Sequence, residues 1–153
     1  MQTQEMKDDI EEICKGLNVK VTWLELTDPG VNCANAKAKI IKVRKISNTG
    51  DYAAALHEIG HTQCDADHKP EPGEGSVLQE CRGWQWAIDQ RGCNFDSAAW
   101  RRIGNGLGEY LNKAGIDEGN APSQCKEIMK RVEEHSVYTA PTPASLVPAK
   151  KRP

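Results

Sequence analysis

The segment LHEIGH, residues 56–61, places two histidines four residues apart with a glutamate directly after the first. On an α-helix, residues four apart lie one turn above each other on the same face. His57 and His61 could therefore direct two imidazole rings at one metal ion. Glu58 would lie about 100° further round the helix, beside the ion rather than on it.

The HExxH spacing is typical of zinc peptidases, in which the glutamate accepts a proton from a water molecule held by zinc. Zinc lowers the pKa of such a water to about 7. The alternative interpretation is a helix with two surface histidines and no metal. The surrounding pattern favours the metal site, because a separate and mostly apolar face of the same helix could pack on the core. That face comprises Tyr52, Ala55, Leu56, Ile59 and Gln63.

A catalytic zinc site needs a third protein ligand and keeps one position for water. Glu80 is the favoured candidate, because it follows the loop after His61 and falls in the first turn of the next expected helix. A ligand on a helix is held rigidly. Three other residues stay open: Asp67, His68 and Cys64.

Each of these alternatives has a specific weakness. Asp67 lies ten residues after His57, where metzincins place a third ligand, but Cys64 stands where those enzymes have a glycine. His68 would require the loop to fold back. A Cys64 thiolate would make the site more structural than catalytic.

LHEIGH together with LQECRGWQWAI, residues 78–88, resembles the ImmA/IrrE-like metallopeptidases, particularly the phage and prophage members. The resemblance covers roughly residues 36–90. It implies a zincin-like fold and one zinc ion, bound by His57, His61 and Glu80 as in gluzincins. It also implies peptide-bond hydrolysis with Glu58 as the general base. Members of this family commonly cleave a repressor or another regulatory protein.

Peptide hydrolysis also needs a donor for the developing oxyanion. Several residues could supply it or line the pocket, and the sequence does not choose among them: Tyr52, His68, Arg82, Tyr110 and Trp84. Trp84 stands four residues after Glu80, so it is either a wall of the zinc pocket or a core residue. The predicted strand 37–46 could receive an extended protein or peptide substrate as an additional strand.

The elements that must position these residues form an α+β pattern. Helical periodicity predicts helices over residues 3–16, 52–64, 76–92, 96–114 and 122–135, and β-formers predict strands over 19–26 and 37–46. We expect one domain, 1–136, in which a small antiparallel or mixed sheet packs against the HExxH helix, with three more helices after it. The lysines of 37–46 are typical of an edge strand. The proline-rich basic tail, 137–153, is predicted to be disordered.

Composition narrows the class of protein. The 153 residues carry a net charge of −2, which gives no basic field for nucleic acid. No apolar run approaches the roughly 20 residues of a membrane span, and the acidic N-terminus lacks the pattern of a signal peptide. We therefore expect a cytoplasmic protein whose six cysteines are free thiols.

Two functional alternatives remain at this point. The first is a zinc-binding interaction module without hydrolytic activity, although a purely structural site would not need Glu58. The second is a metzincin-like protease that uses Asp67 as its third ligand.

Overall fold

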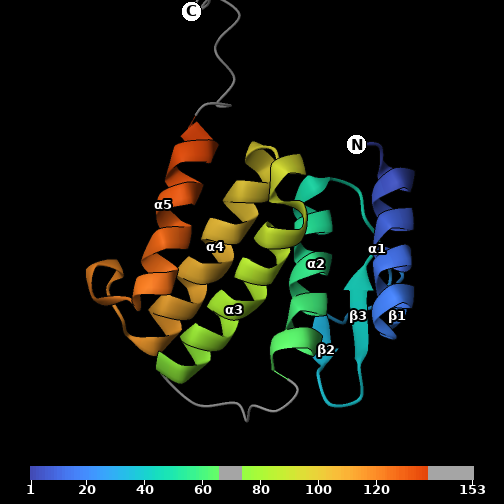
Figure 1. The fold of residues 1–153 in the computed structure, drawn as a ribbon, viewed down its shortest axis with the longest axis horizontal. Helices are drawn as coiled ribbons and strands as arrows, with labels where there is room; N and C mark the ends of the chain where they lie inside the picture. Colours follow the sequence, from blue (N-terminus) through green and yellow to red (C-terminus); the bar gives the residue numbers. More distant parts are fainter. Residues whose placement is uncertain (66–73, 138–153) are drawn as a thin grey trace, which may run out of the picture.

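The computed structural model describes residues 1–65 and 74–137. In these ranges the chain forms an α+β fold of five α-helices and a small mixed sheet. The sheet and α1 lie on one side of α2, and α3, α4 and α5 lie on the other (Figure 1). The helices are α1 (Thr3–Leu17), α2 (Thr49–Cys64), α3 (Glu74–Arg91), α4 (Ser97–Ala114) and α5 (Ser123–Val137). Two single 3-10 turns, Gly92–Asn94 and Glu118–Asn120, follow α3 and α4 respectively. The five helices predicted from the sequence are confirmed.

The sheet has the strand order β1-β3-β2, formed by β1 (Lys20–Leu24), β3 (Ile40–Arg44) and β2 (Cys33–Asn35). β1 runs parallel to β3 and β2 runs antiparallel to it. The prediction that residues 37–46 form an edge strand is wrong, because β3 is the central strand. The lysines are not evidence of an edge strand here, because Lys39 belongs to the preceding turn, with φ 56°, and not to β3.

Ile41 and Val43 are fully buried, as their alternation in the sequence predicts. Their side chains face the core, in which α2 packs against β3 and β2 (Figure 1). β2 was not predicted, because three residues are too few to show a period. Since β3 has neighbours on both sides, only the outer edges of β1 and β2 could accept a further strand among the residues that the structure describes.

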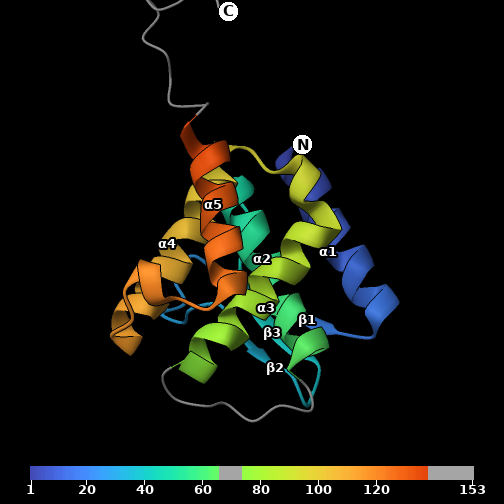
Figure 2. The same cartoon turned by 60° about the vertical axis from the view of Figure 1, so that its left-hand side comes forward.

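α2 is the central helix of the molecule, and it begins three residues earlier than predicted. The Asn48 side chain accepts a hydrogen bond from the Asp51 backbone, which caps the first turn. The sequence suggested one apolar face and one face open to water. Instead, the helix is buried on almost every side, because α3 and α4 cover the part that the sheet leaves free (Figure 2).

Two apolar clusters share α2. One joins α1 and the sheet to Tyr52, Leu56 and Ile59. The other joins α3, α4 and α5 to Ala53 and Ala54. α2 therefore holds the two halves of the fold together, and its central residues lie between the clusters rather than at the surface.

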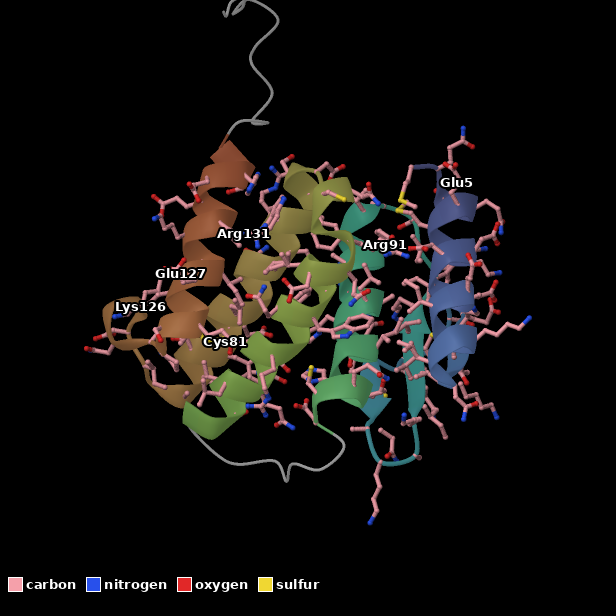
Figure 3. The ribbon with its side chains drawn as sticks, viewed as in Figure 1. Glu5, Cys81, Arg91, Lys126, Glu127 and Arg131 are labelled. Carbon is pink, nitrogen blue, oxygen red and sulfur yellow. A yellow bond between two sulfur atoms is a disulfide. The ribbon has the colours of Figure 1, made fainter. Side chains whose placement is uncertain are left out.

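Cys81 of α3 and Cys125 of α5 form a disulfide, with their Cα atoms 5.7 Å apart (Figure 3). The expectation of six free thiols is therefore wrong for this pair, whereas Cys14, Cys33, Cys64 and Cys93 are free. This pairing could not be predicted from local spacing, because the two cysteines stand 44 residues apart. A disulfide also lends no support to the expected cytoplasmic location, since disulfides are rare in reducing compartments.

The helix boundaries differ from the predictions by small amounts. α3 begins at Glu74 rather than Ser76, whereas α4 begins where predicted, with Asp96 accepting a hydrogen bond from the Ala99 backbone. Of the predicted disordered tail, all but Val137 lies outside the described residues. No helix within 1–65 and 74–137 combines the length and the apolar character that a membrane crossing requires.

Candidate metal centre

α2 and α3 bring His57, His61 and Glu80 together, and one donor atom from each lies within 4.8 Å of the others. Nε2 of His57 is 2.9 Å from Oε2 of Glu80, and Nε2 of His61 is 3.2 Å from Oε1. His57 and Glu80 are buried, and His61 is nearly so. The three residues expected to bind metal therefore form one compact group.

The close approach of the two helices depends on glycines. A Cβ atom on Gly60 would lie 2.7 Å from the Gly83 carbonyl oxygen. A Cβ atom on Gly83 would lie 2.8 Å from Cδ2 of His57 and 3.1 Å from Cε1 of His61. The two glycines let α3 approach α2 closely enough for Glu80 to reach both imidazoles. Sequence reasoning missed both, because the neighbour that demands a small residue is distant in the chain.

The pKa values show strong coupling among the three groups. Burial alone would raise the pKa of Glu80, but interactions with His57 and His61 outweigh it and lower the value to about 2. Burial would lower the pKa of His61, but Asp65 and Glu80 raise it to about 10. The pKa of His57 is also raised, because Glu58 and Glu80 outweigh its burial. The Glu80 carboxylate and the two imidazoles therefore interact strongly with one another.

The position of one buried nitrogen favours a metal ion among His57, His61 and Glu80. Nε2 of His57 makes no hydrogen bond of acceptable geometry, although a Glu80 oxygen lies 2.9 Å away. The two atoms are close but do not point along a shared N–H···O line. That arrangement is expected when a nitrogen lone pair and a carboxylate oxygen both face a third position. Two imidazoles and one carboxylate are a donor set typical of a catalytic zinc site.

Glu58 lies beside this group and does not belong to it. Its carboxylate is 3.4 Å from Nδ1 of His57, and the residue is 9% exposed. Its negative charge contributes to the raised pKa of His61. Glu58 is thus near both histidines, as the helix geometry predicts, and it also contacts the His57 nitrogen that faces away from Glu80.

Trp84 packs directly against the centre. Its indole stacks on the His57 imidazole with ring centroids 3.9 Å apart and planes 11° apart. The indole also lies close to Gly106 of α4, where a Cβ atom would be 3.2 Å from the ring. Trp84 is therefore both a buried core residue and a wall of the candidate site.

The candidates for an oxyanion donor lie in different places. Tyr110 of α4 lies near enough to the centre for the charge of Glu80 to raise the pKa of its hydroxyl. Burial and the charge of Glu58 raise this pKa further. Tyr52 is wrongly assigned: it is fully buried on the α1 side of α2 and donates its hydroxyl hydrogen to Asp9. Tyr52 and His57 are five residues apart, which places them on different sides of the helix.

The other candidates for the third ligand are Asp67, His68 and Cys64. Asp67 and His68 fall outside the described residues. Cys64 is described, but the metal-binding group formed by the described residues does not include it. Its sulfur lies 3.9 Å from the Arg82 carbonyl oxygen.

Asp65 is a residue that the sequence interpretation overlooked. Its carboxylate lies 2.5 Å from Nδ1 of His61 and 3.3 Å from Nη2 of Arg82. The signal was present, because Asp65 stands four residues after His61 and so shares its helical face. Arg82, predicted as a pocket residue, thus lies close to the site but with its guanidinium bound to Asp65.

Comparisons of the chain with protein-family models, curated proteins and solved structures found no match. Membership of the ImmA/IrrE-like family therefore stays a prediction from the sequence. The clustering of His57, His61 and Glu80 is a separate observation, made on the folded chain.

Proposed function

We propose that this protein is a zinc-dependent peptidase in which His57, His61 and Glu80 bind the ion and Glu58 is the general base. The observation that carries the proposal is the convergence of the three donor atoms within 4.8 Å, with a glutamate beside them. A zinc ion in such a site would polarise a peptide carbonyl and lower the pKa of a water molecule to about 7.

Glu58 would accept a proton from the attacking water and pass it to the nitrogen of the leaving amine. Its position supports this role, because it is largely buried and directly follows a ligand histidine. Its contact with Nδ1 of His57 supports a second role, the orientation of that imidazole. The two roles differ in one measurable respect, since only the first is lost when the carboxylate becomes an amide of the same shape.

Tyr110 is the best-placed candidate to donate a hydrogen bond to the developing oxyanion. A tyrosine hydroxyl is protonated at neutral pH, as a donor must be, and the charge of Glu80 raises the pKa of this one further. Arg82 is a weaker candidate, because Asp65 already holds its guanidinium.

A protein substrate would bind in extended form along the sheet. β2 is the outer strand that packs against α2, the helix of the two histidines. The free edge of β2 could therefore pair with the backbone of a substrate segment and hold it beside the metal centre. The proposed docking site is therefore the edge of β2, in place of residues 37–46. We also propose that the substrate is a regulatory protein.

The test compares wild type with Glu58→Gln for zinc content and for cleavage of unstructured casein. We expect both to bind one zinc and only the wild type to cleave. Glu127→Gln, on the exposed surface of α5, is the matched control and should behave as wild type.

Three other outcomes of this experiment would change the assignment. If Glu58→Gln binds zinc and still cleaves casein, Glu58 is not the general base and its contact with Nδ1 of His57 leaves it the orienting role. If wild type binds zinc without cleaving, the interaction-module alternative is favoured. If wild type holds no zinc, the proposed function is wrong.

A further inference from the structure

Asp65 is one of the few buried charged residues in the described part of the chain, with 4% exposure, and each of its carboxylate oxygens has its own partner. Oδ2 meets Nδ1 of His61 at 2.5 Å. Oδ1 accepts hydrogen bonds from Nε and Nη2 of Arg82, at 3.4 Å and 3.3 Å. The carboxylate thus bridges a ligand imidazole on α2 and a guanidinium on α3.

This bridge determines which nitrogen of His61 can bind an ion. A carboxylate at Nδ1 accepts a hydrogen bond, so it keeps the proton on that nitrogen. Nε2 then carries the lone pair, and Nε2 is the nitrogen that lies 3.2 Å from Glu80. The contact at Nδ1 also restricts rotation of the ring.

Arg82 in turn holds Asp65. Asp65 ends α2, and it directly precedes residues 66–73, which lie outside the described structure. Arg82 is on α3, two residues after Glu80. The ion pair therefore fixes the end of α2 to the helix that carries the third ligand, at the level of the site.

We propose that Asp65 and Arg82 are positioning residues for the metal centre, with Asp65 fixing the tautomer and orientation of His61 and Arg82 fixing Asp65. This inference rests on the proposed function, because it concerns the same ion. It predicts an order of effects: loss of Asp65 weakens metal binding most, and loss of Arg82 acts only through Asp65.

The experiment measures zinc affinity by competition with a chelating dye. Asp65→Ala should weaken binding by about 10–100-fold, the usual effect of removing such a partner of a ligand histidine. Asp65→Asn, which keeps an oxygen acceptor, should lose less. Arg82→Gln should show a smaller loss than Asp65→Ala, and adding it to Asp65→Ala should cause no further loss.

The matched control is Asp51→Asn. Asp51 is also on α2 and also pairs with an arginine of a neighbouring helix, since Nη1 of Arg102 lies 3.2 Å away, but it has no contact with the site. It should leave zinc affinity unchanged. A second readout is the tautomer of His61 in the zinc-loaded protein, observed by ¹⁵N NMR, which should show protonated Nδ1 in wild type.

The outcomes separate this inference from the proposed function. If wild type binds zinc and both Asp65 variants bind it equally well, the positioning role is overturned and the metal site stands. Additive losses for Asp65→Ala and Arg82→Gln would overturn the part assigned to Arg82. If wild type binds no zinc, both the site and the positioning role fall.

Discussion

Gly83 illustrates how a residue without a side chain can determine the chemistry of its neighbours. It carries no functional group, yet the space that a Cβ atom would fill is occupied by His57 and His61. The imidazoles are therefore confined between α2 and α3 by contact as well as by hydrogen bonds. A metal centre assembled from two helices needs such a gap, because any side chain at this position would push the ligands apart.

We predict that Gly83→Ala weakens zinc binding and destabilises the fold by about 1–3 kcal/mol, the usual cost of overpacking. Zinc titration and urea unfolding would measure the two effects. The matched control is Gly108→Ala on α4, where a Cβ atom has no neighbour within 4 Å. That change should be neutral or slightly stabilising, because alanine favours helix. Equal behaviour of the two variants would contradict the steric argument.

The sequence predicted which residues form the candidate metal-binding group, but it did not predict most of the residues that support that group. His57, His61 and Glu80 follow from helical spacing and from the length of the connecting segment, both of which are local properties. Asp65 could have been found by the same spacing. Gly83 could not, because its role depends on how closely two helices pack.

At the scale of elements, α3 holds the structure together by making different contacts with consecutive residues. Glu80 faces the histidines of α2, and Cys81 is bonded to Cys125 of α5. The disulfide thus links α3, which carries Glu80, to the last described helix. Its partner could not be read from the sequence, because disulfide pairing depends on the packing of α3 against α5.

We predict that the double variant Cys81→Ala/Cys125→Ala lowers the free energy of unfolding by about 4 kcal/mol, as expected for a cross-link across 44 residues. Urea unfolding with and without dithiothreitol would measure this effect. Reductant should destabilise wild type and leave the variant unchanged. A Cys33→Ala/Cys93→Ala control removes two exposed free thiols and should unfold like wild type. A wild type that is insensitive to reductant would refute the prediction.

For the strands, the sequence pattern predicts which side chains are buried but not the order of the strands in the sheet. The buried alternation of Ile41 and Val43 was correctly predicted, since it depends on which side of one strand faces the core. The order of strands was not, because a three-residue strand such as β2 has no detectable period. For this reason the proposed docking edge is β2 and not residues 37–46.

At the scale of the whole molecule, Asp9 joins α1 to α2 and α3 through hydrogen bonds. Asp9 receives hydrogen bonds from Nε and Nη2 of Arg91 on α3, each 3.0 Å long, and another from the Tyr52 hydroxyl (Figure 3 labels Arg91). Burial alone would raise the pKa of Asp9, but these bonds outweigh it and lower the value. The charged form of Asp9 therefore stabilises the fold.

This contribution has a defined pH dependence. Because the folded chain lowers the pKa of Asp9 below its usual 3.8, the stabilisation is present above that pH and is lost as the pH falls further. Asp9→Asn should destabilise the protein by about 2 kcal/mol at pH 7, and the difference from wild type should shrink at pH 3. Urea unfolding of the zinc-free protein at both pH values would test this.

The neighbouring Asp8→Asn is a suitable control, because Asp8 is exposed and accepts a hydrogen bond only from Gln4 of its own helix. It should change stability little at either pH. A difference between wild type and Asp9→Asn that is the same at pH 7 and pH 3 would contradict the assigned role of the Asp9 charge.

The disulfide also has a consequence for the connectivity of the chain. Bridging Cys81 and Cys125 closes one loop of polypeptide, and an ion bound by His57, His61 and Glu80 would close a second loop that ends one residue before the first begins. The two loops are consecutive and share no residue. To a first approximation, each cross-link then restricts a separate stretch of the unfolded chain, so that losing one leaves the entropic benefit of the other intact. The folded chain would thus contain two consecutive closed loops, which meet between Glu80 and Cys81 of α3.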